Sequence, residues 1–374
     1  MFLGPFRSSK TFGDFILPSE ESLFPLLDSP SIDNRGMFKY TTKIFRAFPP
    51  SPDRHRAWFD RVRSSKHQSW VREGFADFVS LFSHNVHVFE PHMLLAALCF
   101  WNREIHAFEF PCGFIAPTLL DIASLIVIRP SGEVYFCDRF DDAVRDSSLE
   151  LKWDKKTYSH FCAAHQGAPD TPVSDTEHIA FLMYWLSSCV FCSPSLQVPK
   201  SFFNLASLLH REQHVSLSKL LLAALFSALD DASEALSKGS PKNLVGPLWL
   251  LQLWLNSIFE SSLPPSPSST QSFSFEDCRF SYLTPSKKDP SNFHKFLGLI
   301  ASFEEFIETL APTLRLDRRG PQWLIEAPLH TITPSLASST HSFWLPTLHW
   351  DVIFWGMRRQ DVRSYCYHPQ LFSR

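Results

Sequence analysis

The sequence predicts a mainly α-helical protein, a single large helical domain with a small antiparallel β element. Apolar and aromatic residues recur at helical spacing in several separate segments. Two Ser/Thr-x-x-acid pairs stand where helices would begin, and the alternation typical of strands is confined to a short stretch near residues 105–116. A chain of 374 residues that is 44% hydrophobic is long enough to bury one large core.

The N-terminal region divides into two parts. Residues 1–52 mix isolated Phe and Leu with Pro, Ser and Gly and show no period, so we expect an irregular arm there and a domain over 53–374. From Asp53 to Phe82, aromatic residues and Val recur at helical spacing among Arg, Lys and Asp. This pattern predicts one broken helix or two.

The stretch from Pro91 to Gly132 is expected to form the centre of the core. Pro91 stands where a proline is tolerated in the first turn of a helix, and residues 93–101 predict that this helix is buried. Residues 105–110 and 114–116 flank a Pro-Cys-Gly turn. They predict an antiparallel hairpin.

Two capping boxes predict helix starts. Thr118 and Asp121 open a helix that runs through Ile126, and Ser174 and Glu177 precede a helix over 178–191. In such a box the hydroxyl and the acid each bond a backbone N–H of the other residue, which satisfies two donors that the helix itself leaves free.

Three further helices are predicted, over residues 217–236, 246–260 and 292–310. In the first of them we expect three acidic residues to face solvent: Asp230, Asp231 and Glu234. Residues 133–138 predict a short strand. Residues 261–272, SSLPPSPSSTQS, predict a mobile Ser/Pro-rich loop because they offer little apolar area to bury.

Charge, cysteine content and hydropathy limit the class of protein. The formal net charge is −3 and the pI is about 6.6, so no overall basic field indicates nucleic acid. Eight cysteines without a short-range framework favour a reducing compartment. The first residues lack the apolar region of a secretory signal, and the apolar run at 244–255 is shorter than the ~20 residues of a membrane span. We therefore expect an intracellular protein without a membrane segment.

One group of residues offers the ligand types of a tetrahedral zinc site, in a C-x2-H and C-x2-C arrangement: Cys162, His165, Cys189 and Cys192. The last two lie at the end of a predicted apolar helix, where thiols usually pack as small hydrophobes, so packing is the preferred interpretation. His210 and His214 are spaced to share a helix face, but HExxH is absent and no third ligand can be identified. We interpret that segment as a polar connecting loop.

The segment near residue 60 is locally basic and carries interleaved aromatic residues, which together offer phosphate contacts. The candidate nucleic-acid contacts are Arg54, Arg56, Arg61, Arg63 and Lys66, with Arg72 nearby. An ordinary solvated helix face explains the same pattern and is preferred, because a nucleic-acid binder usually has a basic balance over the whole domain.

No catalytic motif is present: the sequence contains no G-x-S-x-G, no Walker A loop and no Rossmann glycine fingerprint. The acidic pairs Asp141/Asp142 and Asp230/Asp231 offer carboxylates for a metal-dependent nuclease, but solvated helix ends explain them as well. A pyridoxal phosphate enzyme needs a Schiff-base lysine, and the candidate lysines lie in polar runs: Lys152, Lys155, Lys156, Lys287 and Lys288. We therefore predict no catalytic residue, no metal and no cofactor.

Several segments together resemble the plant mobile domain family, sometimes labelled aminotransferase-like. They are FWN at 100–102, FEFPCGFIAPTLLD at 108–121, RP at 129–130, GEV at 132–134, FLMYWL at 181–186 and GPLWLLQLW at 246–254. A departure occurs at 126–128, where relatives carry a turn containing Gly-Leu. The residues that carry the resemblance are expected to be structural: Trp101, Phe108, Gly113, Leu119, Asp121, Pro130, Gly132, Trp185, Gly246, Pro247, Trp249, Gln252 and Trp254.

The resemblance, which includes maintenance-of-meristems proteins and copies encoded by transposable elements, implies a function. It implies a non-enzymatic nuclear protein-interaction module that acts with a phosphatase-like partner in transposon silencing, gene expression control and meristem maintenance. Two alternatives stay open. One is a nucleic-acid-binding accessory protein of a plant transposable element, and the other is a degenerate enzyme-like domain in a truncated or degenerate copy.

Overall fold

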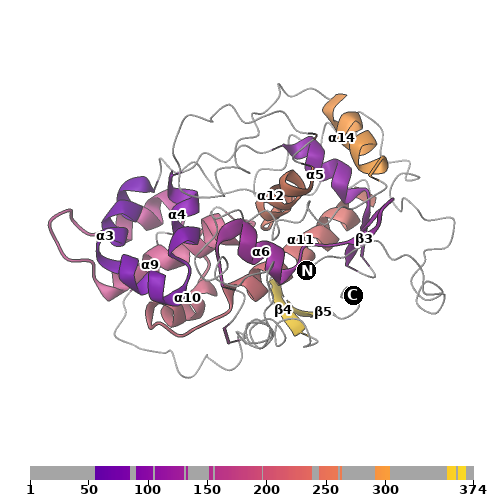
Figure 1. Ribbon diagram of the computed structural model, residues 1–374. Coiled ribbons are helices and arrows are strands. Elements are labelled where there is room, and N and C mark those ends of the chain that lie inside the picture. Colours follow the sequence, from indigo (N-terminus) through magenta and orange to yellow (C-terminus); the bar gives the residue numbers. More distant parts are fainter. Residues whose placement is uncertain are drawn as a thin grey trace, which may run out of the picture.

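The protein is mainly helical, with two small antiparallel sheets and one continuous hydrophobic core among the residues that the structure describes (Figure 1). The computed structural model describes residues 55–84, 90–103, 106–129, 132–133, 151–154, 156–195, 197–237, 244–259, 262, 291–303, 352–358 and 361–367. Two groups of helices lie side by side, and we call them the helical lobe and the sheet lobe.

The helical lobe begins with α3 (Arg56–Glu73) and α4 (Ala76–His84). The sequence left one broken helix or two open, and the structure has two. Gly74 ends α3 with φ 77° and donates its N–H to the carbonyls of Trp70 and Val71. This left-handed conformation costs little only without a Cβ, so the glycine fixes the break.

Four more elements complete the helical lobe: α8 (Tyr158–His165), α9 (Asp175–Trp185), a π-helical turn η2 (Leu186–Val190) and α10 (Phe202–His210). The second predicted capping box is half formed. Ser174 Oγ accepts from the N–H of Glu177 at 3.1 Å, but the Glu177 carboxylate bonds to α3. The helical interpretation of 178–191 is therefore confirmed with an earlier start and a π-helical end.

The sheet lobe is built on α5 (Pro91–Leu98) and three short strands, β1 (Trp101–Asn102), β2 (Ala107–Phe110) and β3 (Gly113–Ile115). Pro91 is the first helical residue, as predicted. The helix ends before the predicted residue 101 because Trp101 pairs with Phe108 in the sheet. The predicted hairpin is β2 and β3, in which Phe108 faces Ile115.

Four more helices belong to the sheet lobe: α6 (Leu119–Ile126), α11 (Leu217–Ser237), α12 (Leu248–Ile258) and α14 (Ser291–Ala301). The capping box of α6 is confirmed, since Thr118 Oγ accepts from the N–H of Asp121 at 3.1 Å and Asp121 Oδ2 accepts from the N–H of Thr118 at 2.8 Å. Val127 follows this helix with φ 57°. This left-handed conformation favours glycine, so a β-branched residue is strained there.

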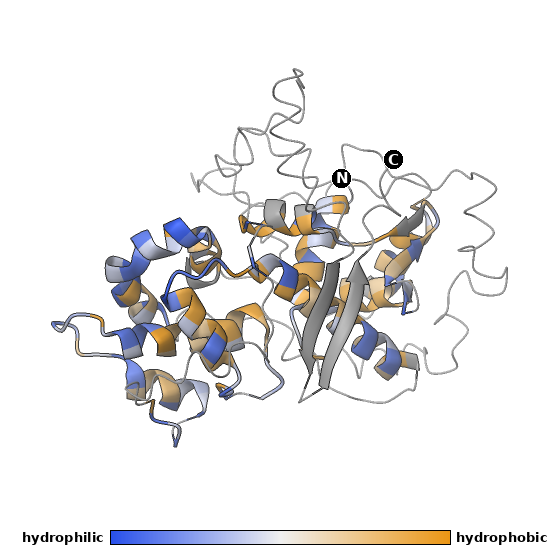
Figure 2. Cartoon of the chain, turned by 90° about the horizontal axis from the view of Figure 1, so that it is seen from below, coloured by the Kyte–Doolittle hydropathy of each residue, from blue (hydrophilic) through white to orange (hydrophobic). Residues whose placement is uncertain are grey.

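The two lobes share one core. The ring centroids of Phe78 on α4 and Trp249 on α12 lie 6.1 Å apart, and Trp249 donates its indole N–H to the carbonyl of Val190 at 3.1 Å. In the helical lobe, the parts of the ribbon that face other helices are mostly hydrophobic and the outer parts are mostly hydrophilic (Figure 2). Truncation of a side chain in this contact region would therefore lower the stability of both lobes.

Several predictions lie outside the described residues: the N-terminal arm, the strand beyond Glu133, the acidic pair Asp141/Asp142, the end of the 292–310 helix and, apart from Ser262, the Ser/Pro-rich loop. The sequence did not predict the antiparallel pair β4 (Val352–Arg358) and β5 (Asp361–Tyr367), in which Arg358 faces Asp361. None of the described helices is both long and apolar enough to cross a membrane.

Candidate functional site

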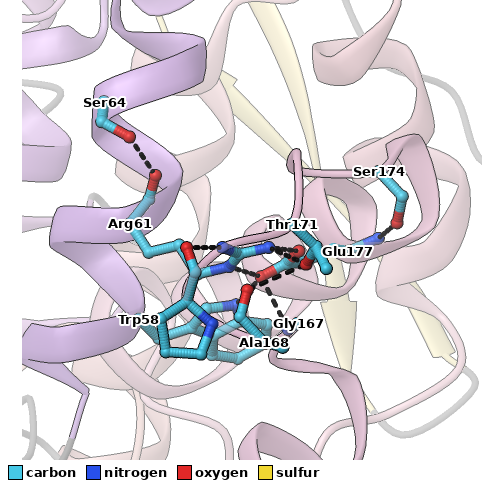
Figure 3. Close-up of polar contacts among 9 residues, drawn as sticks. Trp58, Arg61, Ser64, Gly167, Ala168, Thr171, Ser174 and Glu177 are labelled. Atoms are coloured by element: carbon cyan, nitrogen blue, oxygen red, sulfur yellow. Dashed lines mark hydrogen bonds and ion pairs between the residues drawn. The ribbon is translucent and has the colours of Figure 1, made fainter.

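The most connected polar group in the helical lobe is an ion pair between α3 and α9 (Figure 3). Arg61 donates from Nε to Glu177 Oε1 at 2.8 Å and from Nη2 to Oε2 at 3.0 Å. Trp58 Nε1 and the N–H of Gly167 also donate to Oε1, at 3.2 and 3.0 Å. The two charged side chains are 11% and 4% exposed. The planar guanidinium matches the carboxylate in two places, which fixes the relative position of the helices.

The electrostatics of Glu177 follow from these contacts. Burial acts to raise the pKa of its carboxyl, but the hydrogen bonds from Arg61 and Gly167 outweigh burial and hold that pKa below its ordinary value. Arg61 also donates to the carbonyl of Pro169 at 3.2 Å and to Thr171 Oγ1 at 3.1 Å. One arginine therefore ties α3, α9 and the loop between α8 and α9 together (Figure 3).

A second polar group runs from the core to the surface through two histidines. Trp70 Nε1 donates to His178 Nε2 at 3.0 Å, and His178 Nδ1 lies 2.8 Å from His210 Nδ1. An indole N–H can only donate, so His178 accepts at Nε2 and carries its proton at Nδ1. His210 then accepts at Nδ1 and presents Nε2–H to Asp175 Oδ1, 3.6 Å away. Each side chain in this row therefore donates toward the next one, from Trp70 in the core to Asp175 at the surface.

Burial favours the neutral form of both histidines, His178 and His210. Burial, followed by the influence of His210 and Lys66, lowers the pKa of His178 to about 2. Burial also lowers the pKa of His210. Burial disfavours the protonated form of His178, and both of its ring nitrogens are already engaged, by Trp70 and by His210.

The candidate nucleic-acid contacts are placed in different surroundings. Arg61 is held in the buried ion pair, and Lys66 Nζ lies 3.4 Å from Asp175 Oδ1. Arg63 lies over the ring of Phe59, 5.8 Å from its centroid. Arg56 is exposed on α3, and Arg54 lies outside the described residues. Arg72 pairs with Glu212. Three cations of this segment are thus engaged with carboxylates of the same chain.

The zinc candidates do not converge: among the residues that the structure describes, no three His, Cys, Asp or Glu residues are arranged to hold a metal ion. His165 Nδ1 faces the carbonyl of Phe161 at 2.9 Å, and its Nε2 accepts from the N–H of Lys152 at 3.0 Å. Cys189 and Cys192 are buried, and burial raises the pKa of the Cys189 thiol to about 12. His210 and His214 likewise face different carboxylates, Asp175 and Glu73.

The tryptophans of the family pattern lie in the core. Trp254 stacks on Phe108 with ring centroids 5.6 Å apart, and Trp185 packs edge-on against Phe78 at 5.1 Å. Trp101 donates its indole N–H to Asp230 Oδ1 at 2.9 Å. The prediction that Asp230 faces solvent is therefore wrong, because this carboxylate is the acceptor that the buried indole requires.

The remaining pattern residues fix close backbone approaches and caps. Gln252 Oε1 accepts from the N–H of Glu90 at 2.9 Å. Gly246 has φ 100° and a Cβ there would lie 2.6 Å from Ala228 Cβ, while a Cβ on Gly132 would lie 2.7 Å from the backbone N of Ser216. Leu119 is buried, Gly113 opens β3, Pro247 precedes α12, and Pro130 lies outside the described residues.

Sequence reasoning missed the partners of Glu177 and His178. Glu177 was recognised only as a cap, and His178 only as the start of an apolar run. A carboxylate and a histidine directly before the apolar run at 179–186 were the available signal, because buried polar side chains require partners elsewhere.

The fold and these contacts define a class of protein: a helical domain whose buried polar residues join its helices to one another. A family model described as Plant mobile domain matches residues 75–305, which is more than half of the chain. The chain belongs to the plant mobile domain family. No curated protein and no solved structure gave a significant match. The match begins after α3, yet α3 contributes Trp58, Phe59 and Trp70 to the common core.

Proposed function

We propose that this chain is a non-enzymatic protein-interaction module that acts in the nucleus, with a phosphatase-like protein as a partner. The role that follows is in transposon silencing, gene expression control and meristem maintenance. Family membership supports this assignment. The observation that carries it is that the buried charged and titratable side chains of the helical lobe are engaged in contacts between helices, with Arg61 and Glu177 as the centre.

These contacts favour a rigid scaffold over a reaction site. A general base needs a pKa near the operating pH and access to a substrate, whereas His178 is fully buried and its pKa is lowered to about 2. A scaffold that is already ordered loses little conformational entropy when a partner binds. The internal pairing of Arg61 and Lys66 favours a protein partner over nucleic acid on this face.

The test is a pull-down from plant nuclear extract with the full chain as bait, followed by mass spectrometry. We expect a protein phosphatase or a silencing factor among the specific partners. The control bait is Gly246→Val, in which the new Cβ meets Ala228 and the backbone is strained. Proteins recovered equally by both baits bind apolar residues that a misfolded bait exposes, and they are not counted as specific partners. Recovery of no specific nuclear protein by the folded chain would overturn the proposal.

A further inference from the structure

The structure brings together a second basic surface that sequence spacing does not reveal. The segment around Trp153 lies beside the segment before α10: the N–H of Val198 donates to the carbonyl of Lys156 at 2.8 Å, and Thr157 forms an antiparallel bridge with Gln197. Three lysines are exposed on these two segments. We call them the lysine ledge: Lys152, Lys156 and Lys200.

The ledge is held in place by contacts of its own backbone and side chains. Lys200 Nζ lies over the ring of Trp153, 5.1 Å from its centroid, and Trp153 packs against the core. The N–H of Lys152 donates to His165 Nε2 at 3.0 Å. Because His165 accepts at Nε2, it carries its proton at Nδ1 and is neutral, and burial keeps its pKa below the ordinary value. The hydrogen bond from Lys152 to His165 is therefore kept at neutral pH.

Three exposed lysines stand against one exposed acid, Asp154, among the described residues of these two segments, so the ledge keeps a net positive charge. No carboxylate in the described part of the chain forms a salt bridge with any of the three ammonium groups. Asp154 is the acidic residue within this segment, and it lies between two lysines of the sequence. The contrast with α3 is direct, because Arg61, Lys66 and Arg72 pair with Glu177, Asp175 and Glu212. Uncompensated surface charge attracts a partner of opposite sign.

The chemistry of the ledge distinguishes between possible polyanions. Binding of single-stranded nucleic acid usually relies on free aromatic faces on which bases stack, whereas one face of Trp153 is already covered by Lys200. Lysine ammonium groups act as point charges and suit carboxylates without demanding a particular base edge. We infer that the lysine ledge binds an acidic peptide segment of a protein partner. This inference rests on the proposed interaction function and names the chemistry of the partner.

The test measures fluorescence anisotropy of a short labelled peptide of alternating Glu and Gly with the full chain at low ionic strength. We expect binding that weakens as salt rises. The variant K152Q/K156Q/K200Q should bind about tenfold more weakly, since each exposed charge contact contributes modestly. The control R56Q/R211Q/K295Q removes the same charge from other exposed positions and should stay within about twofold of the unmodified chain.

Three results would overturn the inference. The first is equal weakening by both triple variants, and the second is equal binding of a matched Gln-Gly peptide. The third is binding of a single-stranded oligonucleotide through the ledge lysines without binding of the acidic peptide. The nuclear pull-down separates the two proposals. If a partner is recovered equally by the unmodified chain and by K152Q/K156Q/K200Q, the inference about the lysine ledge fails while the proposed interaction function stands.

Discussion

Aromatic packing occurs inside both lobes, but the helical lobe adds a bidentate ion pair between two of its helices. In the helical lobe, α3 is joined to α9 by polar contacts that cross the core, through the Arg61–Glu177 ion pair and the Trp70–His178 hydrogen bond. In the sheet lobe, aromatic side chains dominate, with Phe108 packed between Trp101 and Trp254. Apolar packing tolerates small shifts of one helix over another, whereas a bidentate ion pair accepts one alignment. The polar contacts therefore specify where α3 lies.

The largest expected effect is in the sheet lobe. Phe108→Ala removes a fully buried ring that contacts two tryptophans, and such truncations lower the free energy of unfolding by about 3–5 kcal/mol. Chemical denaturation measures this loss. Val71→Ala is the control, because Val71 on α3 is 46% exposed, and its change should stay within about 0.5 kcal/mol. Equal losses in both variants would contradict the assignment of Phe108 to the core.

The next effect depends on pH and belongs to the helical lobe. The pKa of His178 is lowered to about 2 by burial, so the unfolded chain binds a proton below pH ~6.5 that the folded chain does not. Stability should fall with decreasing pH, and at pH 5 this residue accounts for about 2 kcal/mol of loss. His178→Phe should flatten the dependence between pH 5 and pH 6.5, as urea denaturation would measure. His160→Phe, on the exposed side of α8, should leave it unchanged.

A smaller loss of stability is expected at the start of α6, where the chain passes from β3 into this helix. The Asp121 carboxylate caps α6 by accepting two hydrogen bonds from Thr118, one from the backbone N–H and one from the hydroxyl. Asp121→Ala should lower the free energy of unfolding by on the order of 1 kcal/mol, the usual cost of a lost cap. Asp121→Asn keeps an acceptor and should lose less. A loss of partner binding at unchanged thermal stability would instead make Asp121 a contact residue.

The most local effect sharpens the comparison most. Glu177→Gln removes the charge that Arg61 faces but keeps the shape of the side chain. Amide hydrogens of α3 should exchange about tenfold faster while those of β2 stay unchanged, because local opening does not require global unfolding. Hydrogen exchange with mass spectrometry measures both segments. Asp170→Asn, an exposed acid in the loop that Arg61 contacts, is the control, and similar acceleration there would contradict the role of the ion pair.

The sequence predicted those parts of the fold whose information is local. The capping box at Thr118, the first-turn Pro91 and the turn before β3 each depend on residues within a few positions of one another, and all three are confirmed. The short helices α8 and α10 were not predicted, because their apolar stripes are brief and depend on packing for support.

The candidate site could be predicted much less well, for a physical reason. Arg61 and Glu177 are 116 positions apart, and Trp101 and Asp230 are 129 positions apart. A single sequence shows that each side chain is polar in an apolar segment, but not which partner the fold supplies. The interpretation of the α3 arginines as a solvated face missed Arg61 for this reason, and the expectation for Asp230 was wrong for the same reason.

The contact between Glu133 and the residues before α11 has a topological consequence. Glu133 donates its N–H to the carbonyl of His214 at 2.7 Å and accepts from the N–H of Ser216 at 2.9 Å. The chain thus leaves the sheet lobe and returns to it at one point, with α8, α9 and α10 in between. A segment whose two ends meet in this way returns the chain to its starting point. The outer surface of this segment can therefore vary without moving its ends, whereas α9 and η2 must be kept because their apolar side chains belong to the common core.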